Sequence, residues 1–200
     1  MRGGEKCATM KAGATGKRFA LKKLICQDAE AAAAARAEVE VHERFDHPNL
    51  LALIDKVFLP YTQNPHWEVC WLLFPLCSCS LRDEITRQVL TDERQPTSTT
   101  WNKPLVVELI AGVCRGLQTM HRQALAHRDV KPENVLLASA EDDRNVDGGR
   151  ALRPVLMDFG SVGPAEVSIR DRRDVLEQVE VAARFCTMQY RAPELFDAAS

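Results

Sequence analysis

The stretch His127-Arg128-Asp129-Val130-Lys131-Pro132-Glu133-Asn134 places a carboxylate, an ammonium group and a side-chain amide within one short segment. Asp158-Phe159-Gly160 follows it 24 residues after Asn134, and Ala192-Pro193-Glu194 comes later in the chain. Any one of these short motifs can arise by chance on a protein surface. Their order and spacing together indicate a phosphoryl-transfer site.

Transfer of a terminal phosphoryl group needs a base for the acceptor hydroxyl proton, a cation on the migrating phosphate and oxygen ligands for Mg²⁺. Asp129 is the candidate base, and Lys131 is the candidate cation. Asn134 and Asp158 are the candidate metal ligands, because Mg²⁺ prefers hard oxygen donors. The sequence therefore predicts that ATP and Mg²⁺ bind at these residues.

Two residues near the N-terminus complete the predicted set, because the triphosphate also needs a strand lysine that a helix glutamate holds in place. Ala20-Leu21-Lys22 fits the strand pattern, and Glu38 lies in the helix expected to follow. Lys23 is the alternative lysine, which a one-residue slip would turn to the other face. Glu40 and Glu43 are alternative carboxylates, more typical of a solvated helix face.

The first part of the chain has the pattern of an antiparallel sheet with one attached helix. Alternating apolar residues predict a strand at Arg18–Ile25. Asp28 is the expected N-cap of a helix from Ala29 to about Phe45. Two apolar runs, Leu50–Leu59 and Trp67–Phe74, are further strand candidates.

From Pro75 onwards, apolar helices replace strands as the dominant prediction. A short helix is expected at Leu81–Val89, and Pro104 opens a long helix with apolar residues on many sides. Two short strands are expected at Val135–Leu137 and Val155–Met157. The predicted class is therefore α+β, with a sheet part followed by a helical part.

Composition excludes several classes of protein. The 200 residues include 26 Lys+Arg and 28 Asp+Glu, so the formal charge is 26 − 28 = −2, which argues against a nucleic-acid partner. The apolar run Val69–Cys77 is too short for a transmembrane segment. Seven scattered cysteines predict reduced thiols and a cytoplasmic location. Cys77 and Cys79 lack a second pair at zinc-site spacing.

These motifs resemble those of the eukaryotic protein kinase family over almost the whole chain. Lys131, together with Thr187 in Cys186-Thr187-Met188-Gln189-Tyr190-Arg191, is similar to the Ser/Thr class. The local sequences at Ala126–Asp129, Arg184–Thr187 and Tyr190–Phe196 resemble those of the myristoylated and palmitoylated Ser/Thr kinase branch of the Numb-associated kinases. That branch resemblance implies peripheral membrane association through an N-terminal segment that this chain lacks.

The kinase resemblance implies a protein-kinase-like bilobal fold. Residues 1–74 would form an antiparallel-sheet N-lobe with one helix and a partial phosphate loop, and residues 75–80 would form a hinge. Residues 81–200 would form the front part of a helical C-lobe, with the catalytic loop and activation segment. The C-lobe would be incomplete, and the chain is expected to be truncated at both ends.

The resemblance also assigns roles to further residues. Thr187 would bridge the catalytic aspartate and lysine, and the substrate would be a protein with a Ser or Thr acceptor. Phe74 would be the gatekeeper beside the adenine, with the backbone of Pro75 and Cys77 meeting the adenine edge.

Arg128 is a candidate partner for a phosphate on the activation segment. Ser161 and Ser168 are candidate acceptors of that phosphate, or ordinary loop serines. His42 and His121 are expected to be structural.

The phosphate loop departs from the family pattern. With Gly3 as the second glycine, Glu5 stands where an aromatic residue is usual and Lys6 where the third glycine should be. This departure favours an alternative, a non-catalytic kinase-like module (a pseudokinase or fragment) that binds a nucleotide or a partner. Retention of all the catalytic side chains favours an active kinase. Ala192-Pro193-Glu194 argues against a small-molecule phosphotransferase.

Overall fold

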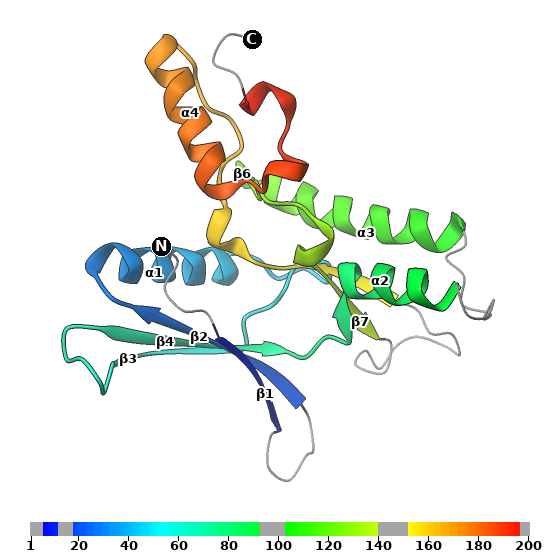
Figure 1. The fold of residues 1–200 in the computed structure, drawn as a ribbon, viewed down its shortest axis with the longest axis horizontal. Coiled ribbons are helices and arrows are strands. Elements are labelled where there is room, and N and C mark those ends of the chain that lie inside the picture. The colour runs from blue at the N-terminus through cyan, green and yellow to red at the C-terminus, as the bar shows by residue number, and fades with distance from the viewer. Residues whose placement is uncertain (1–5, 12–17, 93–102, 140–151, 197–200) are drawn as a thin grey trace.

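A computed structural model describes residues 6–11, 18–92, 103–139 and 152–196 of the chain, and Figure 1 shows its path. Its elements are, in order, strands β1 (Lys6–Lys11) and β2 (Arg18–Cys26), helix α1 (Ala29–Glu43), strands β3 (Asp55–Pro60), β4 (Glu68–Pro75) and β5 (Cys79–Ser80), helices α2 (Leu81–Asp92) and α3 (Lys103–His121), strands β6 (Leu125–Ala126), β7 (Val135–Ser139), β8 (Leu152–Leu156) and β9 (Gly163–Pro164), and helix α4 (Arg172–Phe185). The predicted α+β class, with an antiparallel sheet followed by helices, is confirmed.

The first part of the chain is a four-stranded antiparallel sheet in the order β1-β2-β4-β3. Strand β4 provides much of its buried surface, with Leu72 fully buried and Phe74 nearly so. Lys22 pairs with Leu72 in the register, whereas Lys23 pairs with Trp71. Because successive side chains on a strand point to opposite faces, the two lysines lie on opposite sides of the sheet.

Helix α1 lies across one face of this sheet and packs against β2 (Figure 1). The Asp28 carboxylate accepts a hydrogen bond from the Ala31 N–H at 2.8 Å, so the predicted N-cap is confirmed. The buried face of the helix carries Ala35, Glu38, Val39 and His42. Glu38 and His42 are thus the polar groups that this helix turns towards the interior.

The predicted strand at Leu50–Leu59 is only partly correct, because strand β3 begins at Asp55. Asn49 and Leu51, which precede it, form backbone hydrogen bonds with strand β8 instead. The Leu51 N–H donates to the Leu156 carbonyl, and the Leu156 N–H donates to the Asn49 carbonyl, both at 2.9 Å. Leu50 and Leu51 are buried, and Leu50 packs in one cluster with Met120 and Leu156, so this segment joins the sheet part to strand β8 and helix α3.

In the helical part, strands β5, β7 and β8 form a small antiparallel sheet next to helices α2 and α3. Helix α3 begins at Lys103, close to the predicted start, and buries Leu109, Gly112, Gly116 and Met120. Its apolar residues Val107 and Ile110 are 64% and 59% exposed. No helix among the described residues is long and apolar enough to cross a lipid bilayer.

Helix α4 was not predicted from the sequence. It lies between the Asp158-Phe159-Gly160 motif and Thr187, on the far side of α1 from the large sheet (Figure 1). Its N-cap is Asp171, whose carboxylate accepts hydrogen bonds from the N–H groups of Arg173 and Asp174. The motif residues therefore converge from separate elements onto the junction between the sheet part and the helices.

Candidate active site

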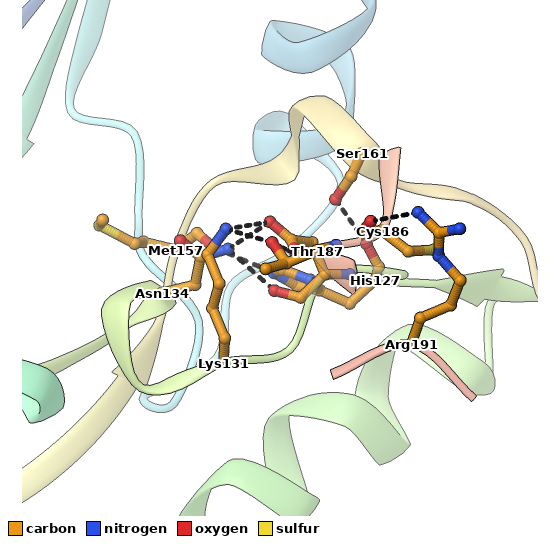
Figure 2. Close-up of polar contacts among 9 residues, drawn as sticks. His127, Lys131, Asn134, Met157, Ser161, Cys186, Thr187 and Arg191 are labelled. Atoms are coloured by element: carbon orange, nitrogen blue, oxygen red, sulfur yellow. Dashed lines mark hydrogen bonds and ion pairs between the residues drawn. The ribbon is translucent and has the colours of Figure 1, made fainter. Parts of the chain in front are cut away.

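Asp129, Lys131 and Thr187 form a compact hydrogen-bonded cluster, although Thr187 is 58 residues from Asp129 (Figure 2). The Lys131 ammonium group lies 2.6 Å from Asp129 Oδ2 and donates to Thr187 Oγ1 at 2.8 Å. The Thr187 hydroxyl in turn donates to Asp129 Oδ1 at 2.6 Å, and the Thr187 N–H donates to the same oxygen at 3.0 Å. The structure thus brings together the three residues predicted to be catalytic.

These contacts keep Asp129 ionised. Burial alone would raise the pKa of its carboxyl group, but hydrogen bonds from Lys131 and Thr187 outweigh burial and lower the pKa below its ordinary value. A carboxylate that is ionised at neutral pH can accept a hydrogen bond from a hydroxyl group and then its proton. Asp129 therefore has the charge state that a base requires.

The backbone around Asp129 is held by His127, which is almost fully buried. The Asp129 N–H donates to His127 Nδ1 at 3.3 Å, so the proton of the neutral ring lies on Nε2, which donates to the Met157 carbonyl at 3.0 Å. Burial lowers the pKa of His127 and favours this neutral form. The ring thus connects Asp129 to the residue that immediately precedes Asp158.

Asn134 and Asp158 fit the predicted metal-binding role by the chemistry of their donor atoms. The Asn134 side-chain NH₂ donates to the Asp129 carbonyl at 2.8 Å and to Asp129 Oδ2 at 3.0 Å, which leaves the amide oxygen for a metal. Asp158 has a left-handed backbone conformation, with φ of 66°. No three His, Cys, Asp or Glu side chains cluster as a metal site in the described segments, so Mg²⁺ held here would also need phosphate oxygens.

Lys22 and Glu38 form an ion pair between strand β2 and helix α1. The distance from Lys22 Nζ to Glu38 Oε1 is 2.8 Å, and the side chains are only 16% and 8% exposed. Lys23, the alternative, lies on the other face of the sheet, with its ammonium group 5.0 Å from the Trp71 ring centroid. Glu40 is exposed, and Glu43 pairs with Lys56.

A cavity of about 490 Å³ connects these groups to the segment that follows β4. Lys22, Glu38 and Asp158 lie along its wall, as do Phe74, Pro75 and Cys77. The lining also includes several apolar residues, namely Ala20, Leu51, Leu76, Leu136 and Met157. The apolar wall of this cavity can bind a flat apolar ring with polar edges. The end that carries the charged side chains can bind phosphate groups.

Residues 3–200 match the family described as protein kinase domain. The chain belongs to the protein kinase family. The match covers the cluster around Asp129, the Lys22–Glu38 pair and the cavity between them. It also covers Gly3 and Glu5 of the predicted phosphate loop, which lie outside the residues that the structure describes.

Individual kinases resemble this chain over most of its length. Serine/threonine-protein kinase 16 of Homo sapiens is 35% identical over 188 residues, which cover 91% of this chain and 53% of that protein. Serine/threonine-protein kinase ENV7 of Saccharomyces cerevisiae is 26% identical over 231 residues, which cover 92% of this chain and 58% of that protein. The kinase chain described here thus spans little more than half the length of these relatives.

Sequence reasoning missed how the segment from Asp158 to Thr187 of this kinase is held. Arg128 donates hydrogen bonds to the backbone carbonyls of Ser161 and Val162, and its guanidinium lies 5.0 Å from the Phe185 ring centroid. The buried Ser161 hydroxyl donates to the His127 carbonyl at 2.7 Å, whereas Ser168 is exposed. The phosphate-binding role of Arg128 stays a prediction.

A second cavity of the kinase, of about 460 Å³, lies between α1 and α4. Its wall includes Glu38, Asp129 and Asp158, so it reaches the predicted catalytic residue Asp129 and shares Glu38 and Asp158 with the first cavity. Arg184 of α4 pairs with Glu30 of α1 at 2.9 Å and lines its rim. This cavity was not predicted, because one of its walls comes from α4, which was not predicted either.

Proposed function

We propose that this protein is an active Ser/Thr kinase, which transfers the γ-phosphoryl group of ATP to a Ser or Thr hydroxyl of a protein substrate. The observation that carries the proposal is the Asp129–Lys131–Thr187 cluster, because its hydrogen bonds leave an ionised carboxylate beside a fixed cation. The names of the relatives as serine/threonine-protein kinases support the choice of acceptor.

Each residue performs one task in this proposal. Asp129 accepts a hydrogen bond from the acceptor hydroxyl, orients it and takes its proton. Lys131 carries positive charge next to that carboxylate, where the charge stabilises the migrating phosphoryl group. Thr187 holds both side chains in place through its hydroxyl.

The nucleotide site would use the remaining residues. Asn134 and Asp158 would hold Mg²⁺, and Lys22, positioned by Glu38, would contact the α- and β-phosphates. Mg²⁺ bound with ATP would neutralise the charge that builds up on the phosphate oxygens. The backbone of Pro75 and Cys77, which line the cavity, would meet the adenine edge next to Phe74.

The division into an N-lobe at residues 1–74, a hinge at 75–80 and a C-lobe from 81 belongs to the same proposal. The end of β4 at Pro75 and the start of α2 at Leu81 support it. We also propose that the chain belongs to the Numb-associated kinase branch, because its sequence motifs around His127 and Thr187 resemble those of that branch. We further propose a cytoplasmic location, which the scattered cysteines support, and peripheral membrane association, which that branch resemblance implies.

Phosphate transfer from labelled ATP to Ser- and Thr-containing peptides tests the activity. Asp129→Asn should reduce transfer by about 10²–10⁴-fold, the usual contribution of a positioned base. Asp158→Ala should abolish transfer through loss of a metal ligand. Asp46→Asn is the matched control, because Asp46 is an exposed residue of the turn after α1, and this variant should keep full activity.

Binding of a fluorescent ATP analogue, measured on the same proteins, separates catalysis from nucleotide binding. We expect Asp129→Asn to bind the analogue with nearly the affinity of the unsubstituted protein. A protein that binds the analogue but never transfers phosphate would support the non-catalytic alternative. Transfer that survives both Asp129→Asn and Asp158→Ala would contradict the assigned roles.

A further inference from the structure

Arg82, Glu133 and Tyr190 form a hydrogen-bonded bridge that the proposed mechanism does not use. Arg82 Nε, on helix α2, donates to Glu133 Oε1 at 2.8 Å. Arg82 Nη2 donates to the Tyr190 hydroxyl at 2.6 Å. The bridge therefore joins helix α2 to two segments that are 51 and 108 residues away from Arg82.

The bridge lies close to the place where an acceptor hydroxyl would meet Asp129. Glu133 directly precedes Asn134 and is two residues from Lys131, so its Cα is at most about 7.6 Å from that of Lys131. Tyr190 is three residues after Thr187. An extended peptide advances about 3.3 Å per residue, so a side chain within a few residues of the acceptor can reach the bridge.

Arg82 neutralises a carboxylate that would otherwise attract cations, because its Nε and Glu133 Oε1 form an ion pair at 2.8 Å. Glu133 Oε2 is buried and has no hydrogen-bond partner among the described residues. The Arg82 and Glu133 side chains are 40% and 44% exposed, so a bound peptide can contact the pair.

The Arg82 guanidinium retains capacity for a ligand. It has five N–H donors in all, and its contacts with Glu133 and Tyr190 account for two of them. Lys131, two residues before Glu133, carries a second positive charge, which is paired with Asp129 at 2.6 Å. Arg82 is therefore the cation at this edge that has N–H donors left for a peptide, and the Glu133 carboxylate beside it is already paired.

We propose that Arg82 determines specificity by selecting acceptor peptides with an acidic side chain near the phosphorylated residue and by disfavouring peptides with a basic one. This inference rests on the proposed kinase function and adds a substrate class to it. A peptide carboxylate would pair with the free N–H groups of Arg82. A basic side chain would be repelled by the guanidinium, and Glu133 could not offset this, because its Oε1 is bonded to Arg82 and its Oε2 is buried.

The test compares three synthetic peptides that share one Ser in an Ala-rich sequence. They carry Glu, Ala or Arg at a single position, which is moved through the three residues on either side of the Ser. The measured quantity is the ratio of kcat/KM for the Glu peptide to that for the Arg peptide. For the unsubstituted protein, we expect a ratio of about three to ten at one or more positions, the size of an exposed charge interaction.

Variants of the bridge should move this ratio in opposite directions. Arg82→Ala leaves the Glu133 carboxylate unpaired, so the ratio should fall below one, mainly through KM. Glu133→Gln leaves the Arg82 charge uncompensated, so the ratio should rise. Arg82→Lys keeps the charge and should keep a ratio above one. Higher salt should bring every ratio towards one.

Arg87→Ala is the matched control, because it removes the same charge from the same helix. Arg87 donates to both Glu84 carboxylate oxygens, at 2.9 and 2.7 Å, and Glu84 is also on α2. Its ratio should equal that of the unsubstituted protein. Circular dichroism and thermal melting of each variant establish that it is folded before its ratio is measured.

Three outcomes would overturn the inference while leaving the kinase function standing. They are a ratio near one for the unsubstituted protein at every position, an unchanged ratio in both Arg82→Ala and Glu133→Gln, and equal changes in Arg82→Ala and Arg87→Ala. Absence of transfer to every peptide by the unsubstituted protein would instead refute the proposed function, and this inference with it.

Discussion

Protonation of His42 is expected to destabilise the fold as the pH falls from about 6.5 towards 4. The ring is buried against Phe159 and Phe74, with centroid distances of 4.4 and 5.0 Å. Its Nδ1 donates to the Leu51 carbonyl at 3.0 Å, so the proton of the neutral ring lies on Nδ1. Protonation would add charge to Nε2, which lies 4.0 Å from Glu38 Oε1.

The magnitude follows from the two pKa values of His42. Burial lowers its pKa from 6.5 to about 4 in the folded protein, despite raising effects from the Leu51 hydrogen bond and Asp158. The unfolded chain therefore takes up the proton first, so the stabilisation is complete above pH 6.5 and is lost as the pH falls to about 4. At about 1.4 kcal/mol per pH unit, the full loss is about 3 kcal/mol.

Urea unfolding of the protein and of His42→Gln at pH 7.0 and 4.5 measures this contribution. Gln can still donate to the Leu51 carbonyl but does not titrate, so the variant should lose about 2–3 kcal/mol less between the two pH values. His121→Gln is the control, because it makes the same replacement at a histidine that is exposed at the end of α3. Equal losses in the protein and in His42→Gln would refute the reasoning.

Three further perturbations have clear expected outcomes. Lys22→Met should remove most phosphate transfer whereas Lys23→Met should keep it, because only Lys22 pairs with Glu38 in the cavity; equal loss in both would contradict this. Gly112→Ala should lower the free energy of unfolding by about 1–3 kcal/mol in urea titrations, because the new Cβ would overlap the Pro154 ring; an unchanged midpoint would contradict it. Ser161→Ala should cost about 1 kcal/mol of stability yet retain peptide phosphorylation, because its hydroxyl is buried and bonded to the His127 carbonyl; complete loss of transfer would show that this hydroxyl is needed.

The catalytic loop could be predicted from sequence because its contacts are local. Asp129, Lys131 and Asn134 lie within six consecutive residues, so their side chains are close together in space and can form hydrogen bonds with one another. Lys22 could be chosen over Lys23 because Ala20-Leu21-Lys22 fits the strand pattern of the motif, and neighbouring strand residues lie on opposite faces. Thr187 is distant in sequence, and only the family motif pointed to its bond with Asp129.

Features that depend on tertiary packing could not be predicted in this way. The run Leu50–Leu59 is apolar enough for a strand, but its first residues pair with β8 rather than with β4. Helix α4 had a usable signal, since Asp171 is followed by Val175, Val179 and Ala182 at helical spacing. The Arg82 bridge had none, because charged residues 51 apart carry no sequence pattern.

Arg128 connects the segment between Asp158 and Thr187 to the loop that carries Asp129. Its guanidinium bonds the carbonyls of Ser161 and Val162 near the start of this segment and contacts the Phe185 ring near its end. The Arg184–Glu30 pair also joins the segment to α1, but its side chains are largely exposed. Exposed ion pairs contribute about 0–1 kcal/mol, whereas hydrogen bonds from a charged, half-buried donor contribute more. The position of Thr187 beside Asp129 therefore depends more on Arg128 than on the contact between α4 and α1.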